Sequence, residues 1–222
     1  MRIKILPYTH LEPDENMKTD LEMAVRSLKE KTFIFRWYGW RGLALSFGRS
    51  QCTEIEKFNI PLKKTCRPTG GGILLHGWDI SFALTAPPGY FDHFLQLYRF
   101  VARTFVRTFS DLNVSVHYSR NKKGNYLTGK YCWNFPSFGE VVVKNKKLVA
   151  AAVRKFEEGH LLIHGSVYIT FNRKFLEKKY PQLLKNFKNQ IATLTEVNVK
   201  KSDLMAKFSE NLQKELGKLA HL

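Results

Sequence analysis

The sequence has few cysteines, few acidic residues and no long apolar run. Its three cysteines, Cys52, Cys66 and Cys132, are widely spaced and form no CxxC pair, which argues against a disulfide framework and against a cysteine-based zinc site. No stretch reaches the roughly 18 apolar residues that a membrane span needs. The N-terminal segment MRIKILPYTHLEPDEN turns acidic before any apolar core develops, unlike a secretory signal. We therefore expect a cytoplasmic protein with free thiols.

Linkers and internal repeats are also missing. The 222 residues are 44% hydrophobic and 14% aromatic, a composition that excludes a disordered chain and can form a proper core. A chain of this length corresponds to one domain. We expect residues 1–222 to form a single domain.

Acidic residues are outnumbered, with 19 Asp and Glu against 36 Lys and Arg, so that the formal net charge is +17. Such a charge fits nucleic acid, an acidic protein partner, or a lysine-rich surface of the thermophilic kind. The basic residues are spread along the chain and form no compact stripe, although RNKKGNY at 120–126 is typical of a basic loop. The charge alone favours an acidic partner or a thermophilic surface over nucleic acid.

The hydrophobic pattern predicts an α+β fold, with a mixed β-sheet backed by a few helices. Apolar residues at helical spacing predict helices, with Ser202 as the N-cap of the last one, at 15–30, 91–109 and 201–217. β-Branched and aromatic runs predict strands at 32–40, 44–48, 72–76, 80–86, 139–143, 146–153 and 161–169. We expect 44–48 to pair with 32–40, and a hairpin to turn at Lys144 and Asn145.

The segment RPTGGGILLH places three glycines before a strand. Gly70, Gly71 and Gly72 permit positive φ and allow a ligand to approach the backbone closely. The spacing matches neither a Walker loop nor a dinucleotide fingerprint, and a glycine-rich bulge is the alternative. Arg67, which can hold a carboxylate or phosphate, and His76 at the strand end favour a binding pocket.

Two further residue types with reactive side chains lie beyond this segment. Strand alternation turns one of Lys146 and Lys147 inward, and desolvation lowers the pKa of an inward lysine, which suits it to proton transfer. The alternative is a solvated pair at a hairpin turn. Cys132 is either a thiol packed among Tyr131 and Trp133 or a nucleophile.

Four motifs in fixed order, WRGLALSFGRSQ, RPTGGGILLH, NKKLVAAAVRK and HGSVYI, resemble the biotinyl/lipoyl protein ligase superfamily over nearly the whole chain. Within it the pattern is similar to lipoate–protein ligases and to octanoyl-[carrier protein]:protein octanoyltransferases. The resemblance implies the catalytic-domain fold of that superfamily. It also implies an apolar acyl tunnel floored by the three glycines, with Arg67 and His76 at its edge.

The same resemblance implies roles for the strands that follow. Lys147 would point at the acyl carbonyl, and His164 and Gly165 would belong to the facing strand. This chain has Ala150 and Ala151, followed by a third alanine, where the family usually has Gly-Ser-Ala. The substitution removes a serine hydroxyl that could donate a hydrogen bond.

Cys132 lies where the resemblance implies a nucleophile. Transferases with a ligase-like sequence have their reactive cysteine in this loop, directly before a PS-x-x-E segment, and CWNFPSFGE resembles that arrangement. A neighbouring ammonium favours the thiolate, which is the attacking species. The expectation is a dyad across adjacent strands, with Cys132 as nucleophile and Lys147 as acid/base. Cys52 and Cys66 match no such position and are interpreted as structural.

Two chemistries are compatible with the resemblance. A ligase activates free lipoate with ATP and magnesium, whereas a transferase takes octanoate from a carrier thioester and needs no cofactor and no metal. Only one helix and a short tail are expected after the last strand, too little for the accessory domain of a ligase. This length and Cys132 favour the transferase. The alternatives are a ligase catalytic subunit with a separate accessory chain, and an amidotransferase moving acyl groups between carrier domains.

The transferase interpretation implies partners in lipoate biosynthesis. The donor would be octanoyl-acyl carrier protein, and the acceptors would be lipoyl domains of 2-oxoacid dehydrogenases or the glycine cleavage H protein. Both kinds of partner are typically acidic, so the charge of +17 would steer them onto the enzyme. A basic nucleic-acid-binding module is the non-enzyme alternative. Biotin attachment is disfavoured because a GRGRxGRxW-type loop is missing.

Overall fold

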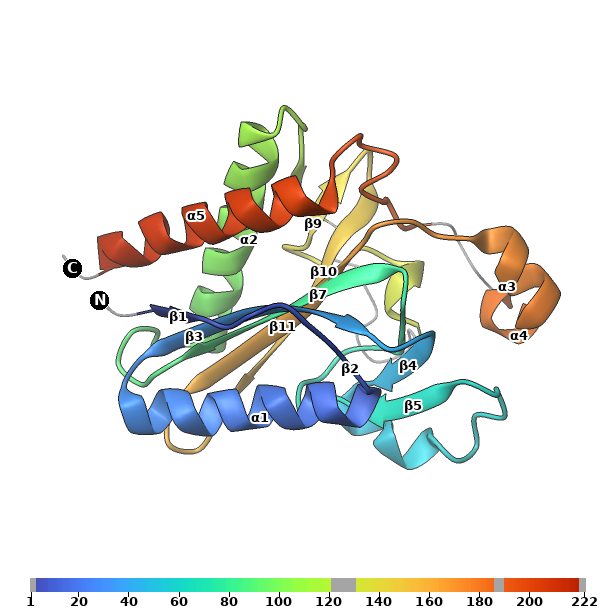
Figure 1. Ribbon diagram of the computed structural model, residues 1–222, viewed down its shortest axis with the longest axis horizontal. Coiled ribbons are helices and arrows are strands. Elements are labelled where there is room, and N and C mark those ends of the chain that lie inside the picture. The colour runs from blue at the N-terminus through green and yellow to red at the C-terminus, as the bar shows by residue number, and fades with distance from the viewer. Residues whose placement is uncertain (1–2, 121–130, 186–189, 220–222) are drawn as a thin grey trace.

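The computed structural model describes residues 3–120, 131–185 and 190–219. It confirms the α+β class, with a mixed sheet of eight strands, a second sheet of three strands, and three long helices (Figure 1). The elements are β1 (Ile3–Ile5), β2 (Thr9–Leu11), α1 (Pro13–Glu30), β3 (Phe33–Trp40), β4 (Ala44–Phe47), η1 (Arg49–Glu54), β5 (Lys63–Cys66), β6 (Leu74–His76), β7 (Asp79–Ala86), α2 (Phe94–Asp111), β8 (His117–Tyr118), η2 (Cys132–Asn134), β9 (Val141–Val143), β10 (Lys146–Lys155), β11 (Leu161–Tyr168), α3 (Arg173–Lys179), α4 (Pro181–Leu184) and α5 (Lys201–Leu219).

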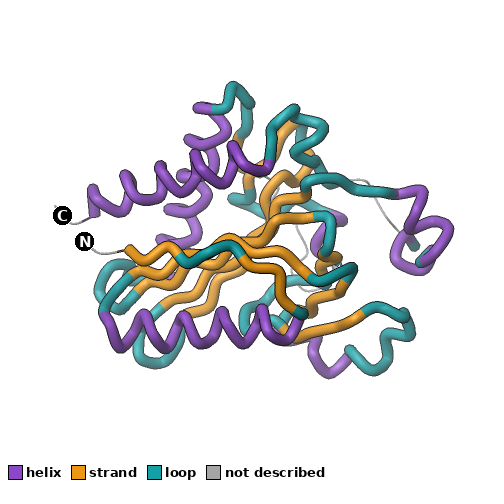
Figure 2. The backbone as a smooth tube through the Cα atoms, in the orientation of Figure 1, coloured by secondary structure: helices purple, strands orange, loops and turns teal. Residues whose placement is uncertain are grey.

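The larger sheet has the order β1-β3-β7-β11-β10-β9-β8, and β2 also pairs with β3. Strands β1 and β2 run parallel to β3 at its two ends, and the other neighbours are antiparallel. Helix α1 covers one face, and α2 and α5 cover the other (Figures 1 and 2). The central strands are therefore enclosed by helices on both sides.

This enclosure explains the almost wholly apolar sequence of β3. Successive side chains of a strand point to opposite faces, so Phe35 and Trp37 pack with the α2 and α5 side. Ile34 and Tyr38 pack with α1. Every residue of β3 is buried, as is every residue of β7.

An aromatic cluster joins the two helices to this sheet. The ring of Phe208 on α5 lies 4.2 Å from that of Phe105 on α2, between ring centroids. It also lies 5.5 Å from Phe35 and 5.3 Å from Trp37. Aromatic rings at these separations contribute packing energy beyond their buried area. The cluster fixes α5 and α2 against the strands that lead to the site.

The smaller sheet, in the order β5-β4-β6, holds the glycine segment between β5 and β6. The expectation that β4 pairs with β3 was wrong, because β5 and β6 occupy its two edges. The expectation of free thiols was wrong at two positions, since the sulfurs of Cys52 and Cys66 are bonded to each other. Cys132 is the remaining free cysteine. The disulfide connects η1 to the residue directly before Arg67.

The structure settles three smaller expectations. The hairpin of β9 and β10 turns at Lys144 and Asn145, whose φ angles of 46° and 62° are those of a tight strand turn. Ser202 lies inside α5, which begins at Lys201, so it is not the N-cap. The chain after β11 forms α3 and α4 as well as α5, more than the one helix expected. Most of the RNKKGNY segment lies outside the described residues.

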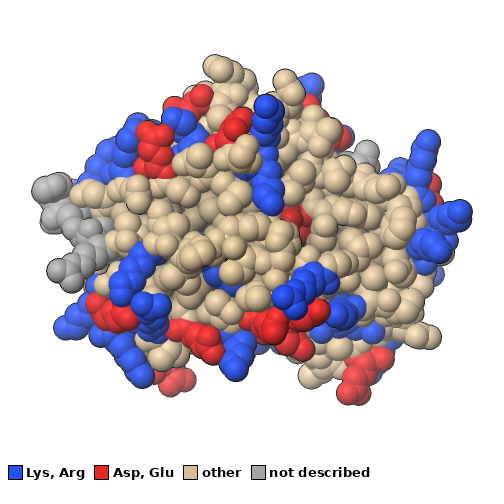
Figure 3. Space-filling view, in the orientation of Figure 1, with Lys and Arg blue, Asp and Glu red and all other residues tan. Residues whose placement is uncertain are grey.

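Charged side chains are distributed over the surface. On the face shown in Figure 3, Lys and Arg lie mainly around the perimeter and are interspersed with Asp and Glu. Within the described part of the chain, no helix combines the length and the apolar character needed to cross a membrane.

Replacing Phe208 by Ala should lower the free energy of unfolding by about 3–5 kcal/mol, because it removes a ring at the centre of the aromatic cluster. Val25→Ala is the matched control, since the Val25 side chain is 49% exposed, and it should cost less than about 0.5 kcal/mol. Denaturant unfolding of the purified variants measures both. Equal effects of the two substitutions would contradict this account of the core.

Candidate active site

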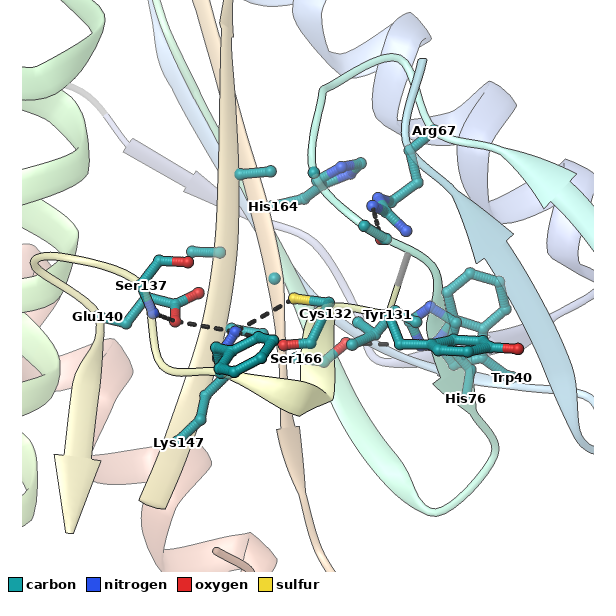
Figure 4. Close-up of a pocket in the computed structure, with 18 of the residues that line it drawn as sticks. Trp40, Arg67, His76, Tyr131, Cys132, Ser137, Glu140, Lys147, His164 and Ser166 are labelled. Carbon is teal, nitrogen blue, oxygen red and sulfur yellow. Dashed lines mark hydrogen bonds and ion pairs between the residues drawn. The ribbon is translucent and has the colours of Figure 1, made fainter. Parts of the chain in front are cut away.

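A cavity of about 90 Å³ lies between the glycine segment, β10, β11 and the segment 131–140. Its walls include ten of the residues predicted from the sequence, namely Arg67, Gly71, Gly72, His76, Cys132, Lys147, Ala150, Ala151, His164 and Gly165. In Figure 4 the sulfur of Cys132 faces Lys147, and Arg67 and His164 lie on the opposite wall. Gly70, also predicted, is not among the lining residues, although its carbonyl accepts a hydrogen bond from Arg67.

Cys132 and Lys147 are in direct contact. The Lys147 Nζ lies 3.3 Å from the Cys132 Sγ and donates to the Cys132 carbonyl at 2.6 Å. Cys132 begins η2, and its backbone N–H donates to the carbonyl of Ile73 at 2.8 Å. The pair is thus formed between η2 and β10, not across adjacent strands as expected. The thiol is held beside the strand that follows the glycines.

Glu140 completes this cluster, and the sequence reasoning did not assign it a role. Its Oε2 lies 2.8 Å from the Lys147 Nζ and accepts from the backbone N–H of Ser137 at 2.6 Å. Glu140 and Lys147 are each only 4% exposed. Each of the three N–H groups of the ammonium therefore has an acceptor. These are the carbonyl oxygen and the sulfur of Cys132 and the carboxylate of Glu140. The PS-x-x-E segment after Cys132 is the sequence feature that could have pointed to this carboxylate.

The pKa of Lys147 differs from the sequence expectation. Burial lowers it, but the charges of Cys132 and Glu140 and their hydrogen bonds outweigh burial and raise the pKa of Lys147 to about 12. Burial also raises the pKa of Glu140, against the opposing charge of Lys147. The inward orientation of Lys147 is confirmed, whereas the predicted lowering of its pKa is wrong. Lys147 is therefore an ammonium in contact with the Cys132 sulfur.

Replacing Lys147 by Met should slow alkylation of Cys132 by iodoacetamide at pH 7 about tenfold, because the thiolate loses its adjacent ammonium. Lys146→Met is the control, since Lys146 is the neighbouring residue on the exposed side of the strand. It should leave the alkylation rate unchanged. Mass spectrometry at timed intervals gives both rates. Equal slowing in the two variants would refute the idea that the Lys147 ammonium makes the Cys132 thiol more reactive.

Arg67 does not present a free guanidinium, contrary to the expectation that it holds a carboxylate or phosphate. One terminal nitrogen donates to the carbonyl and to the hydroxyl of Ser46, at 2.7 and 2.6 Å. The other donates to the carbonyls of Gly70 and Gly72, at 3.3 and 2.6 Å. Gly71 between them has φ +98°, a conformation that favours glycine. Arg67 therefore holds the glycine turn in shape.

His164 connects the same segment to α1. Its Nε2 is 2.6 Å from the hydroxyl of Thr69, and its Nδ1 is 2.8 Å from a carboxylate oxygen of Asp20. The guanidinium of Arg36 pairs with Asp20 at 2.7 Å. Asp20 and Arg36 are both buried, as are His164 and Thr69. This chain of polar groups ties the glycine segment to the centre of the larger sheet.

His76 belongs to a second series of buried polar side chains joined by hydrogen bonds. Its Nε2 lies 2.6 Å from the Ser46 hydroxyl, and its Nδ1 lies 2.8 Å from Asp79 Oδ2. The ring also stacks on Trp40, with centroids 3.8 Å apart. Burial lowers the pKa of His76, an effect that Asp79 opposes. Because Ser46 also accepts from Arg67, neutral His76 supports the arginine that holds the glycines.

Acidification should destabilise the protein partly through His76. The folded-state pKa of this group is lowered from 6.5, so its contribution is present above about pH 6.5 and is lost as pH falls through the lowered value. His76→Gln should flatten the decline of unfolding free energy below pH 6.5. His93→Gln, at an exposed histidine, should retain the wild-type decline. Denaturant unfolding across pH 5–8 compares them, and parallel curves for wild type and His76→Gln would contradict the assignment.

Gly165 shows why the wall of the cavity is built from small residues. A Cβ at this position would lie 2.1 Å from the Ala150 carbonyl and 2.7 Å from the Phe82 ring. Ala151 is its partner in the β10–β11 ladder. The close approach of the strands excludes a side chain here, and the alanines leave room beside Cys132. The wall is therefore apolar at Ala150 and Ala151.

Other lining residues escaped prediction from the sequence, chiefly Trp40, Tyr131, Phe135, Ser137, Glu140 and Ser166. They come from separate elements and have no common motif beyond the PS-x-x-E segment. Searching the described residues for three or more His, Cys, Asp or Glu side chains grouped to hold a metal ion finds none.

The fold and this site define a class of protein. The chain matches the lipoyl protein ligase A/B catalytic domain over residues 12–217 and belongs to that family, which confirms the resemblance seen in the sequence. It is 27% identical over 207 residues to octanoyltransferase LipM of Anoxybacillus flavithermus, covering 82% of this chain and 74% of that protein. For octanoyltransferase LipM of Halalkalibacterium halodurans, identity is 25% over 209 residues, with 82% and 75% covered.

A solved structure of similar fold is lipoate-protein ligase A bound with ATP. Its TM-score to this chain is 0.76, with 16% sequence identity, and the match covers 98% of this chain and 86% of that one. At this identity the similarity establishes the fold. It confirms the predicted catalytic-domain fold.

Proposed function

We propose that this protein is an octanoyltransferase that moves an octanoyl group from a carrier thioester to a lysine of lipoyl domains, as one catalytic domain. The relatives named octanoyltransferase support the reaction class. The observation that carries the proposal is the Lys147 ammonium, which lies 3.3 Å from a free thiol in a partly apolar cavity. A thiol held this way is the group that thioester exchange requires.

In the first step the Cys132 thiolate attacks the carbonyl carbon of the octanoyl thioester. A new carbon–sulfur bond forms to Cys132, and the bond to the donor sulfur breaks. The departing donor thiolate takes a proton from the Lys147 ammonium. This transfer becomes favourable in the acyl-enzyme, because Cys132 is then neutral and no longer raises the pKa of Lys147.

In the second step the amine of the acceptor lysine attacks the same carbonyl carbon. The amide bond forms, the bond to Cys132 breaks, and the neutral Lys147 amine accepts the proton that the attacking nitrogen loses. The thiolate and ammonium are thereby restored. Glu140 stays beside Lys147 through both steps and keeps its Nζ aimed at Cys132. Donor thioester and acceptor amine become free thiol and amide, with no proton left over.

The binding residues have separate roles in this proposal. Arg67, with the chain through His76, keeps the glycine turn open to the acyl chain, and His164 anchors the same turn. Ala150 and Ala151 with Gly165 line the apolar wall. The donor we propose is octanoyl-acyl carrier protein. The acceptors are lipoyl domains of 2-oxoacid dehydrogenases or the glycine cleavage H protein.

Incubation of the protein with octanoyl-acyl carrier protein, without ATP or magnesium, should produce an octanoyl adduct on Cys132. A lipoyl domain added next should receive the group. Cys132→Ser should lower transfer at least about a thousandfold, because an alcohol is a far weaker nucleophile than a thiolate. Peptide mass spectrometry locates the adduct. Transfer only with free lipoate and ATP would reverse the conclusion in favour of a ligase, and full activity of Cys132→Ser would refute the acyl-enzyme.

A further inference from the structure

A second hollow lies beside the segment 134–139, across from the cavity that contains Cys132. It has a volume of about 1480 Å³ and is bordered by α2, β8 and that segment. Phe135 lines both hollows. In Figure 4, Ser137 and Glu140 lie on the side of the cavity nearer α2. The second hollow therefore adjoins the first across a single loop.

One face of α2 forms a wall of this second hollow. Gln96, Arg99, Arg103 and Val106 all line it, and their spacing of three and four places them in one row on a helix. Arg99 and Arg103 are exposed, and no carboxylate of the described chain forms an ion pair with either. Arg107, which follows them on the helix, is paired with Glu215 at 2.7 Å. Among the described residues, the row thus presents two guanidinium groups with no carboxylate paired to them.

Exposed aromatic side chains lie opposite these arginines. Phe138 is 52% exposed and Tyr118 is 39% exposed, and both line the hollow. None of the described residues that line it is an Asp or Glu. Scattered apolar residues are ordinary on a surface, whereas a group of them around a concavity is typical of a binding surface. Within the described part of the chain, this groove combines exposed aromatic rings with arginines that have no carboxylate partner.

We propose that the groove docks the donor, an acidic carrier protein that presents its thioester on a long phosphorylated arm. The inference rests on the function proposed above. Guanidinium groups match phosphate and carboxylate geometry, and aromatic rings accommodate the apolar part of such an arm. The net charge of +17 attracts an acidic carrier from a distance, and the two arginines provide a local site at which its acidic groups can bind.

The position of the groove fits the donor better than the acceptor. A thioester at the end of a long arm reaches Cys132 while the carrier body rests one loop away. An acceptor lysine has a short side chain, so the domain that bears it must come directly to the mouth of the Cys132 cavity. Phe135, shared by both hollows, lies where an arm would pass from one to the other.

Charge reversal tests the proposal with the full-length protein. The variant R99E/R103E is compared with K18E/K29E, which makes the same change of net charge on exposed residues of α1. Helix α1 covers the opposite face of the sheet (Figure 1). Steady-state transfer is measured with octanoyl-acyl carrier protein, with the small uncharged thioester octanoyl-N-acetylcysteamine, and with the lipoyl domain as varied substrate.

For R99E/R103E the KM for the octanoyl carrier should rise about tenfold more than for K18E/K29E. The kcat/KM should fall much less with the small thioester than with the carrier, and melting temperatures show whether both variants are folded. An equal rise in the KM for the carrier in both variants would overturn the proposal, because it would show that only the net charge of the protein matters. A rise in KM for the lipoyl domain instead would make the groove an acceptor surface and equally overturn it. A wild-type protein that transfers nothing from the carrier would refute the proposed function itself.

Discussion

The buried ammonium of Lys147 is the constraint on which the rest of the site depends. Taking a charged side chain out of water is costly unless its partners are close and well oriented. Cys132 and Glu140 meet that requirement, since they accept all three of its protons. The same contacts keep Lys147 protonated in the resting protein. In the proposed reaction, acylation of Cys132 removes one of these partners, and Lys147 changes from a cation to a base.

The glycine segment depends on a comparable set of buried polar groups. Arg67 donates hydrogen bonds to its carbonyls. The chain through His76 holds Arg67 in place, and the chain through His164 holds Thr69. One chain ends at Asp79 at the start of β7 and the other at Asp20 on α1. The run of glycines is thus fixed to two rigid elements, and its backbone borders the cavity that contains the Cys132 thiol.

Much of this was predictable from the sequence. The aromatic strand that became β3, the helices α1 and α2, and the turn at Lys144 and Asn145 follow from local periodicity and turn chemistry, which act over a few residues. Pairing of β4 away from β3 was not predictable, because strand neighbours are chosen by contacts far apart in the chain. The bond between Cys52 and Cys66 was missed for the same reason.

The sequence by itself determined the family, the α+β class, and the thiol and lysine on which the proposal rests, because those depend on residue identity and local order. Only the tertiary structure decided their states. It brought Glu140 beside Lys147 and so raised a pKa that burial alone would lower. It also turned Arg67 from an expected ligand-binding group into the support of the glycine turn. Electrostatic balance depends on every neighbour within a few ångströms, and those neighbours come from elements far apart in the chain.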